Sequence, residues 1–262
     1  MQEMIKLETR DKLAEIWLNR PEAFNSFDLE MITRLSEVLI GISLQSEIEG
    51  ILITGMGKAF CAGGDLKWIQ ASGEDYASSF HKLAAKYHQA ILEIRRMPKP
   101  VVAAVNGLAA GGGFSLALAC DFRVMEKSAV LRQAYTSNGL SMDGGGTFTL
   151  PRIVGSAKAL EIATFDRPID SDQAKKWGLA TEVVEDGKSY HRARDILLEI
   201  GAGSIASFAA SKNLITDSFD TSFEVQLEKE RHRLSLCSDS PEGREGIKAF
   251  QEKRKADYRK VR

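Results

Sequence analysis

The chain has 262 residues, enough for one large domain or for a domain with a helical appendage. Its 35 lysines and arginines nearly balance its 36 aspartates and glutamates, so no overall basic field draws it to nucleic acid or to anionic lipid. Apolar residues make up 44% of the chain and no low-complexity tract is present, which excludes a disordered protein and indicates a soluble globular one.

The cysteines and the N-terminus indicate the compartment. Cys61, Cys120 and Cys237 are widely spaced, odd in number and in no metal-ligand pattern. Such a set is typical of reduced intracellular thiols and not of a disulfide framework. The first residues contain no basic stretch leading into an apolar core, as an export signal would. We therefore expect a cytoplasmic protein without a bound metal.

In the first half of the chain, strand patterns alternate with helix patterns. Residues 4–18 predict a hairpin. Ser26 or Asp28 can cap a helix with a regular apolar face. The β-branched run at 51–54 predicts a strand, and the amphipathic stretch at 74–97 predicts a long helix that ends at two prolines.

The pattern then becomes mainly helical. Strands are expected at 101–105, 121–125 and 129–132, with a helix at 114–120. From about residue 147 to 254 the pattern is almost wholly helical, with one strand-like interruption at 181–185. Alternating strands and helices followed by helices indicate an α/β core with a helical C-terminal region.

One uncharged stretch could be mistaken for a membrane span. Val101 to Cys120 is long enough to cross a bilayer, but Asn106 and several glycines interrupt it. We interpret it as a strand, a glycine turn and a short buried helix. No contact with a membrane is expected.

Two glycine-rich segments each follow a strand-like apolar run. The segment 58–66 follows the run at 51–54, and the segment 107–113 follows the run at 101–105. Without a Cβ, glycine lets backbone N–H groups lie bare against a ligand. The second segment also ends where a helix begins, so its N–H groups carry the positive end of a helix dipole. Two such turns predict two backbone donors aimed at one oxygen atom, as acyl chemistry requires. We therefore favour this functional interpretation over the structural one, in which the glycines only form tight turns.

The side chains near these turns have structural as well as functional interpretations. Asp143 stands among apolar residues and glycines, a pattern that fits a helix N-cap and a buried carboxylate beside a ligand equally well. We interpret Ser115 as a small polar residue packed at a helix start and not as a nucleophile. No serine-hydrolase elbow, Walker loop or dinucleotide fingerprint is present. The four histidines, which have no ligand spacing, are His81, His88, His191 and His232.

A series of motifs along nearly the whole chain carries a family resemblance. They are Leu18-Asn19-Arg20-Pro21, Ala59-Phe60-Cys61-Ala62-Gly63-Gly64-Asp65, Val105-Asn106-Gly107, Gly111-Gly112-Gly113, Leu150-Pro151-Arg152-Ile153-Val154-Gly155, Ala174-Lys175-Lys176-Trp177-Gly178-Leu179 and Glu242-Gly243-Arg244-Glu245-Gly246. In this order they resemble the crotonase superfamily, the family of enoyl-CoA hydratases and isomerases.

The resemblance implies an α/β fold and a substrate class. A spiral of ββα turns is expected over residues 1–200, and a helical trimerisation region over 201–262. The resemblance implies a homotrimer, or a hexamer built as a dimer of trimers. It also implies an acyl-CoA thioester as substrate, with coenzyme A entering as part of that substrate and with no prosthetic group.

The same resemblance assigns roles to individual residues. The backbone N–H groups of Gly64 and Gly112 would form an oxyanion hole for the thioester carbonyl. Phe250 and Lys253 match positions at which a neighbouring subunit touches the nucleotide. The residues that match the part of the family in contact with coenzyme A are Ala23, Phe24, Ala62, Gly63, Asp65 and Leu66.

Two departures from the family's hydratases bear on the reaction. Those enzymes carry two glutamates, at the positions that Ser115 and Tyr135 occupy here. Adding water across a double bond needs a base for the water and an acid for the α-carbon. The surroundings of Asp143 instead resemble isomerases of the phenylacetate-degradation type, in which one aspartate shifts a double bond or rearranges a ring epoxide. One carboxylate can remove a proton and return it two carbons away.

The chain also resembles the 4-chlorobenzoyl-CoA dehalogenases at Asp143, because these enzymes carry a nucleophilic aspartate at the matching position. His88 matches their histidine, whereas Tyr135 stands where they carry a tryptophan. A helix at 74–97 would accept a histidine for packing or solubility alone. We therefore rank dehalogenation second among the reactions that use Asp143.

The sequence thus favours an enoyl-CoA isomerase, with Asp143, Gly64, Gly112, Tyr135 and His88 as catalytic candidates. One alternative is a hydratase or hydrolase that uses a water positioned by Asp143 and Tyr135. Another is a non-catalytic CoA-ester binder or an RNA-binding relative. The near-neutral charge argues against nucleic acid as a partner, and the two glycine turns with an aspartate in register argue against an inactive site.

Overall fold

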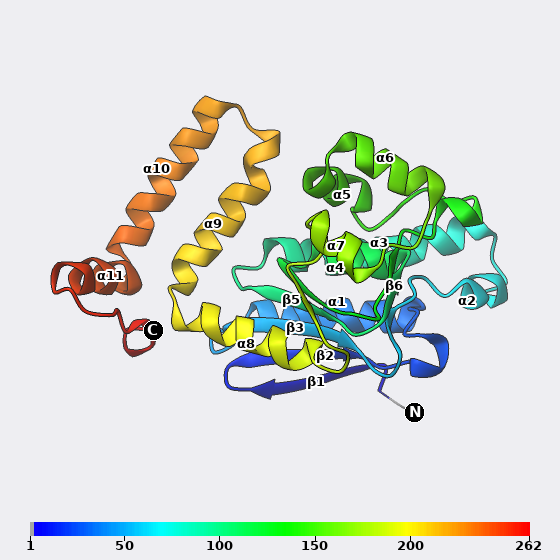
Figure 1. The fold of residues 1–262 in the computed structure, drawn as a ribbon, viewed down its shortest axis with the longest axis horizontal. Helices are drawn as coiled ribbons and strands as arrows, with labels where there is room; N and C mark the ends of the chain where they lie inside the picture. The colour runs from blue at the N-terminus through cyan, green and yellow to red at the C-terminus, as the bar shows by residue number, and fades with distance from the viewer. Residues whose placement is uncertain (1–2) are drawn as a thin grey trace.

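The computed structural model describes residues 3–262, and within them two β-sheets form the centre of the molecule (Figure 1). The larger sheet has the strand order β1-β2-β3-β5-β7-β9, and the smaller has the order β4-β6-β8. Strands β1 and β2 are an antiparallel hairpin, and the other paired strands are parallel. The strands are β1 (Ile5–Arg10), β2 (Leu13–Leu18), β3 (Gly50–Gly55), β4 (Ala59–Cys61), β5 (Val101–Val105), β6 (Leu108–Ala110), β7 (Phe122–Glu126), β8 (Leu131–Arg132) and β9 (Glu182–Val184).

One pattern of strands repeats along the chain. β3, β5 and β7 of the larger sheet are each followed closely by a short strand of the smaller sheet, namely β4, β6 and β8. A helix comes next in the first two turns: α2 (Leu66–Ala71) and α3 (Tyr76–Arg96) follow β4, and α4 (Gly112–Ala119) follows β6. This repeat is the spiral of ββα turns, and the predicted fold class is confirmed.

The buried strands explain the long apolar runs in the sequence. β3 and β5 are buried along their whole length, because a parallel sheet is covered on both faces. The main core lies between one face of the larger sheet and the helices α1 (Leu29–Ser43), α3 and α4. A smaller cluster joins the opposite face to α8 (Ser189–Ala202).

Local signals set the helix boundaries. Asp28 is the N-cap of α1, where its carboxylate accepts a hydrogen bond of 2.9 Å from the N–H of Met31. Of the two predicted caps, Asp28 is therefore the right one and Ser26 is not. The helix predicted over 74–97 is α3, which Asp75 caps in the same way.

The uncharged stretch from Val101 to Cys120 lies in the core. It forms β5, β6 and α4, and every residue of α4 is buried. No helix within residues 3–262 is both long enough and apolar enough to cross a membrane. The interpretation of this stretch as strand, turn and buried helix is confirmed.

Several short elements differ from the prediction. β4 and β6 lie inside the segments interpreted as glycine turns, and α2, which follows the first of them, was not predicted. These elements are too short for hydrophobic periodicity to register. α4 begins at Gly112, earlier than the predicted 114–120, and β8 is shorter than the predicted 129–132.

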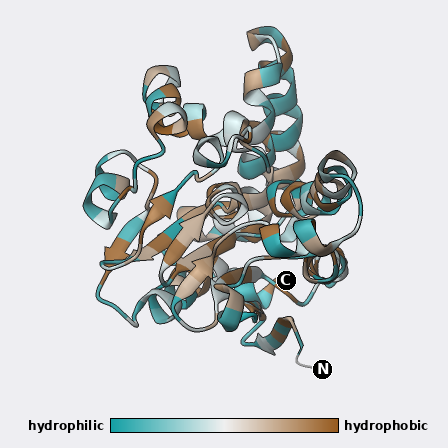
Figure 2. Cartoon of the chain, turned by 90° about the vertical axis from the view of Figure 1, so that its right-hand side faces the viewer, coloured by the Kyte–Doolittle hydropathy of each residue, from teal (hydrophilic) through white to brown (hydrophobic). Residues whose placement is uncertain are grey.

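After β8 the chain is almost wholly helical, as predicted, with β9 as the interruption. The remaining helices are α5 (Gly146–Val154), α6 (Ser156–Phe165), α7 (Ser171–Lys176), α9 (Ile205–Asp217), α10 (Phe223–Asp239) and α11 (Pro241–Gln251). Helices α9 to α11 form an arm beside the sheets (Figure 1). Hydrophobic residues gather in the central strands, whereas the outer helices mix both kinds (Figure 2). The predicted domain boundary at 200/201 falls in the last turn of α8 and stays a prediction.

A buried ion pair holds the arm to the core. The ammonium group of Lys212 on α9 lies 2.8 Å from Oδ2 of Asp121 and donates hydrogen bonds to the carbonyl oxygens of Ile94 and Lys99. Burial raises the pKa of Asp121 and lowers the pKa of Lys212, although each partner's charge opposes the shift. The attraction between the two charges therefore offsets part of the free-energy cost of burying them.

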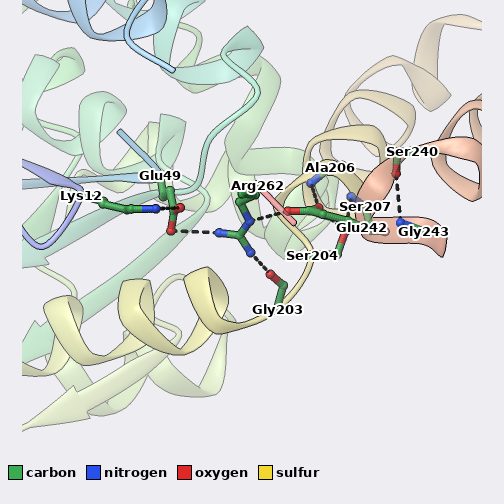
Figure 3. Close-up of polar contacts among 10 residues, drawn as sticks. All are labelled: Lys12, Glu49, Gly203, Ser204, Ala206, Ser207, Ser240, Glu242, Gly243 and Arg262. Carbon is green, nitrogen blue, oxygen red and sulfur yellow. Dashed lines mark hydrogen bonds and ion pairs between the residues drawn. The ribbon is translucent and has the colours of Figure 1, made fainter. Parts of the chain in front are cut away.

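Arg262 makes a second attachment near the start of the arm (Figure 3). Its Nη1 lies 2.9 Å from Oε2 of Glu49, whose other oxygen lies 2.9 Å from Nζ of Lys12. The Nε of Arg262 donates to Glu242 of α11, and its Nη2 donates to the carbonyl oxygen of Gly203. One guanidinium thus connects the core, the arm and the link between α8 and α9.

Candidate active site

The two glycine turns meet backbone to backbone. Gly63 has a φ of +91°, and a Cβ on it would lie 2.7 Å from the nitrogen of Gly112. A Cβ on Gly113 would lie 1.9 Å from the carbonyl oxygen of Cys61. No side chain fits at either position without a backbone shift. Glycine is thus needed at these positions for the two turns to approach each other. The sequence suggests a different reason, the approach of a ligand to the backbone.

Gly64 and Gly112 both line one pocket. Neither N–H donates a hydrogen bond to an acceptor within the described part of the chain. Gly112 is the first residue of α4, so the positive end of the helix dipole strengthens the attraction of its N–H for negative charge. Two free donors on one pocket can stabilise negative charge on an oxygen atom between them.

The pocket has a volume of about 490 Å³ and lies between α3 and the segment 134–143. Apolar side chains from both sides form most of its wall: Phe27, Leu66, Phe80, Leu83, Leu140 and Met142. The side chains with polar atoms on its wall are His81, Tyr87, Tyr135, Asn138, Ser141 and Asp143. An apolar wall with few polar groups is the usual composition of a small-molecule site.

Asp143 is held in the wall of this pocket by two elements. Its Oδ1 lies 2.6 Å from Nε2 of His88 on α3. Its carbonyl oxygen accepts a hydrogen bond of 2.7 Å from the hydroxyl of Ser115 on α4. The next residue, Gly144, has a φ of +63°, and a Cβ there would lie 2.3 Å from the ring of Tyr87.

The N-cap interpretation of Asp143 is wrong. The N-cap of α5 is Gly145, whose backbone is left-handed, and the carboxylate of Asp143 caps no helix. Of the two interpretations left open by the sequence, the structure supports a carboxylate beside a ligand pocket.

Ser115 and Tyr135 lie next to Asp143. Ser115 is fully buried and donates its hydroxyl to the carbonyl of Asp143, in agreement with the packed polar residue expected there. Burial raises the pKa of Tyr135 above its usual range, and the nearby charge of Asp143 adds to this. The phenol is thus protonated well beyond neutral pH and can act as a hydrogen-bond donor beside Asp143.

Tyr87 is a site residue that the sequence did not single out. It is buried, its hydroxyl donates to the carbonyl oxygen of Gly112, and its ring packs against Phe27 with centroids 4.8 Å apart. In the sequence it belongs to the regular apolar face of the predicted helix, and only the following residue, His88, attracted a functional interpretation.

Cys61 is excluded as a nucleophile. Its thiol is fully buried, and burial raises its pKa to about 12. The N–H of Gly63 donates to its sulfur at 3.4 Å. The residue supports the first glycine turn.

The segments matched to coenzyme A binding lie side by side. The N–H of Ala62 donates to the carbonyl of Phe24 at 3.0 Å, and the N–H of Phe27 donates to the carbonyl of Gly63 at 2.8 Å. Ala23 ends the short helix η1 (Pro21–Ala23) just before Phe24, whose side chain is exposed.

Asp65 and Leu66 continue the first glycine turn into α2. Leu66 lines the pocket. The carboxylate of Asp65 caps α2 and lies 3.0 Å from Nη2 of Arg20, so its charge is engaged within the chain. A contact of Asp65 with coenzyme A stays a prediction, as it does for the neighbouring residues.

Phe250 and Lys253 lie apart from this pocket. Phe250 is at the end of α11 with its side chain 86% exposed, and Lys253 follows with a left-handed backbone. Neither lines the pocket of its own chain. Their predicted contact with a neighbouring subunit's nucleotide stays a prediction.

Residues 8–261 match the sequence model of the enoyl-CoA hydratase/isomerase family. The chain belongs to this family. It is 33% identical to the 1,2-epoxyphenylacetyl-CoA isomerase of Escherichia coli strain K12, over 98% of this chain and 99% of the relative. It is 32% identical to the crotonyl-CoA hydratase of Syntrophomonas wolfei, over 98% of each chain. It is 29% identical to a 4-chlorobenzoyl-CoA dehalogenase of an Arthrobacter species, over 95% of this chain and 91% of the relative.

A solved structure has the same architecture. The crystal structure of an enoyl-CoA hydratase from Polaromonas sp. JS666 superposes with a TM-score of 0.91, at 34% identity over 96% of this chain and 98% of the other. This family member is therefore an enzyme of the enoyl-CoA hydratase/isomerase type. Because isomerases, hydratases and dehalogenases are all among its relatives, membership alone does not select the reaction.

Proposed function

We propose that this enzyme moves a double bond in an enoyl-CoA, or isomerises a ring-epoxide acyl-CoA, with Asp143 as its single acid and base. One observation carries the proposal: within residues 3–262, Asp143 is the one carboxylate that lines the pocket. Ser115 and Tyr135 stand where the hydratases of the family carry glutamates, so the second carboxylate needed for hydration is missing.

The reaction would begin with the thioester carbonyl between the N–H groups of Gly64 and Gly112. The carboxylate of Asp143 takes a proton from C2 of a 3-enoyl thioester, and the electron pair moves onto the thioester oxygen as a dienolate. The same carboxyl group then returns the proton to C4. Each backbone donor can lower the barrier by roughly 3–4 kcal/mol, because the negative charge develops on the oxygen that it faces.

The first test is Asp143→Asn. We expect double-bond migration in a 3-enoyl-CoA to be abolished while the Kd of the CoA ester stays within a few-fold of the parent, because the amide keeps the size of the side chain but cannot take up a proton. Asp195→Asn, on an exposed part of α8, is the matched control and should keep the parental rate. Isomerisation by the Asp143 variant at near the parental rate would exclude Asp143 as the base.

A second test separates isomerisation from hydration. Crotonyl-CoA and 3-enoyl-CoA are incubated in ¹⁸O-water, and the products are analysed by mass spectrometry. Unlabelled, shifted enoyl-CoA supports the isomerase, whereas ¹⁸O in a 3-hydroxyacyl product supports water addition through Asp143 and Tyr135.

Dehalogenation is the second candidate, and the contact between His88 and Asp143 favours it. The carboxylate would attack the ring carbon that bears chlorine, chloride would leave, and a water activated by His88 would hydrolyse the aryl ester. Release of chloride from 4-chlorobenzoyl-CoA, with formation of the 4-hydroxy product, would place this activity first. A panel that also contains straight-chain and aromatic enoyl-CoA esters compares the substrate classes directly.

We also propose a cytoplasmic homotrimer or dimer of trimers, with coenzyme A bound only as part of the substrate and no prosthetic group. In support, no residue of α10 is buried within its own chain, and Phe223, Leu234 and Leu236 on it are exposed. Sedimentation equilibrium tests the assembly, and a monomer at micromolar concentration would contradict it. Phe250→Ala should then raise the KM of the CoA ester, since the neighbouring subunit would lose its contact.

A further inference from the structure

Asp143 stands between two different environments. On one side its carboxyl group lines the apolar pocket. On the other side its Oδ1 contacts Nε2 of His88 at 2.6 Å, and His88 does not line the pocket. The side chain of His88 is 51% exposed, against 35% for Asp143. The histidine is therefore the more solvent-accessible member of the pair.

The two carboxylate oxygens have separate tasks in this arrangement. Oδ1 is engaged by His88, whereas Oδ2 accepts no hydrogen bond from the residues that the structure describes. Oδ2 is thus the oxygen free to face an acyl chain. Nδ1 of His88 also has no hydrogen-bond partner within residues 3–262, and half of the imidazole side chain is exposed, so the ring can exchange protons with water.

We propose that His88 connects the proton held on Asp143 to solvent and so controls how much of the substrate proton returns to the substrate. The inference rests on the proposed isomerase function. His88 acts through Asp143 and touches no reacting atom, so it is a positioning residue. Imidazole suits this task because each of its two ring nitrogens can accept or donate a proton.

The exchange needs only solvent water besides the two side chains. After Oδ2 of Asp143 has taken a deuteron from C2, the neutral carboxyl group turns about its Cβ–Cγ bond and brings the deuteron to His88. In the tautomer that carries its proton on Nδ1, the imidazole accepts the deuteron at Nε2 and becomes an imidazolium. The imidazolium exchanges its N-bound deuteron for a proton of water, releasing HDO. It then returns a proton to the carboxylate. The two side chains end with the charges that they had after proton abstraction, and only the isotope has changed.

Two fates of the dienolate follow from this exchange. If C4 is protonated before exchange, the label stays in the product. If exchange is faster, the product carries a solvent proton at C4. The accessible His88 favours the second fate, whereas a carboxyl group facing only the apolar pocket would favour the first.

The experiment uses the full-length enzyme and a 3-enoyl-CoA with two deuterium atoms at C2. Intramolecular transfer gives a doubly deuterated 2-enoyl-CoA, and exchange gives a singly deuterated one, so mass spectrometry measures their ratio. In His88→Gln the amide can still donate to Asp143 but cannot carry a proton. We expect the ratio of doubly to singly deuterated product to rise at least about fivefold in this variant, because the route to solvent is removed.

Two further variants distinguish proton exchange from simple orientation. His88→Leu removes the hydrogen bond as well, and it should raise the same ratio while also lowering kcat. His191→Gln is the matched control, because His191 is exposed on α8 and does not line the pocket. Its isotope ratio should equal that of the parent.

The possible outcomes separate this inference from the function on which it rests. An unchanged ratio in His88→Gln overturns the exchange role while leaving the isomerase intact. A rise in His88→Leu but not in His88→Gln also overturns it, because orientation would then be the cause. A parent enzyme that does not move the double bond contradicts the proposed function itself. Substrate incubated with Asp143→Asn measures non-enzymatic loss of label, which is subtracted.

Discussion

The hydroxyl of Tyr87 donates a hydrogen bond to the carbonyl oxygen of Gly112. The ring of the same side chain leaves no room for a Cβ on Gly144, the residue after Asp143. One aromatic side chain from α3 thus touches both the proposed oxyanion donor turn and the turn that carries the proposed base. The relative position of these two groups therefore depends on Tyr87.

Replacing Tyr87 by phenylalanine tests this dependence. The change keeps the ring against Gly144 and removes only the hydroxyl. A buried hydrogen bond of this kind contributes a net stabilisation of about 1 kcal/mol. We expect kcat for double-bond migration to fall by roughly tenfold with little change in KM, since a misaligned donor weakens transition-state binding more than substrate binding.

Tyr76→Phe is the control for this variant. Tyr76 begins the same helix, but its side chain is largely exposed, so the loss of its hydroxyl should leave both constants at the parental values. Steady-state kinetics on a 3-enoyl-CoA measures both variants. A Tyr87 variant with parental kcat would mean that the Gly112 turn keeps its position without the hydroxyl.

The sequence was sufficient to predict elements whose side chains repeat regularly. α3 has an apolar stripe at helical spacing, which predicts a helix. β3 and β5 are short, continuous apolar runs next to turn residues, a pattern typical of buried strands. The glycine turns could also be found, because clustered glycines directly after a strand indicate a tight turn or a close backbone approach. The three-residue strands β4 and β6 are too short to show a hydrophobic period, so the sequence predicts only turns where they lie.

Spacing and periodicity do not predict contacts between residues that are far apart in the sequence. His88 and Asp143 are 55 residues apart, and only the folded chain brings them to hydrogen-bond distance. The sequence places Tyr87 only on the apolar stripe of its helix, because periodicity does not reveal where a hydroxyl points. The two interpretations of Asp143 could be separated only once α5 was seen to begin after Gly145, without Asp143 as its cap.

The close contact of the glycine turns predicts opposite effects for two alanine substitutions. Gly113→Ala would put a Cβ 1.9 Å from the carbonyl oxygen of Cys61. Because backbone must move to relieve it, we expect the free energy of unfolding to fall by about 3 kcal/mol. A Cβ on Gly41, within α1, would meet no atom within 4 Å. Gly41→Ala should therefore raise the free energy of unfolding by about 0.5–1 kcal/mol.

Urea unfolding followed by circular dichroism compares these two variants with the parent. The pair also serves as an internal control, because both changes add the same methyl group to a helix. Equal effects of the two substitutions would mean that the backbone contact between the turns is not tightly packed.

The ion pair between Lys212 and Asp121 predicts a pH-dependent loss of stability. Lys212→Met leaves the carboxylate of Asp121 buried without its cation, which should cost about 3–5 kcal/mol at pH 7. Burial already raises the pKa of Asp121 in the folded protein. A group with a raised folded pKa contributes stability below its unfolded pKa and loses it as the pH rises through the folded value. The variant should therefore be less impaired at pH 5 than at pH 7.

A double variant separates the lost charge from lost packing. Asp121→Asn combined with Lys212→Met removes both charges but keeps an acceptor for the N–H of Val101, so it should recover part of the loss. Lys229→Met, which breaks an exposed pair with Asp217, should change stability by less than about 0.5 kcal/mol. A Lys212 variant with the same deficit at both pH values would contradict the buried-charge explanation.

Arg262 predicts the opposite dependence on pH. Burial tends to raise the pKa of Glu49, but hydrogen bonds from Lys12 and Arg262 outweigh it and hold the pKa below its ordinary value. A group with a lowered folded pKa contributes stability above its unfolded pKa and loses it as the pH falls through the folded value. We expect Arg262→Ala to lower the free energy of unfolding by about 2 kcal/mol at pH 7. We expect this deficit to shrink in acid, as the pH falls far enough to protonate Glu49.

The matched control for Arg262 is Arg244→Ala. Arg244 lies on α11, and its ion pair with Asp239 is exposed on both sides, so its removal should have little effect at either pH. Urea unfolding of the three proteins at pH 7 and at pH 3.5 provides the comparison. A constant deficit for Arg262→Ala across this range would mean that the guanidinium stabilises the arm through packing or through the carbonyl of Gly203, and that the charge of Glu49 contributes little.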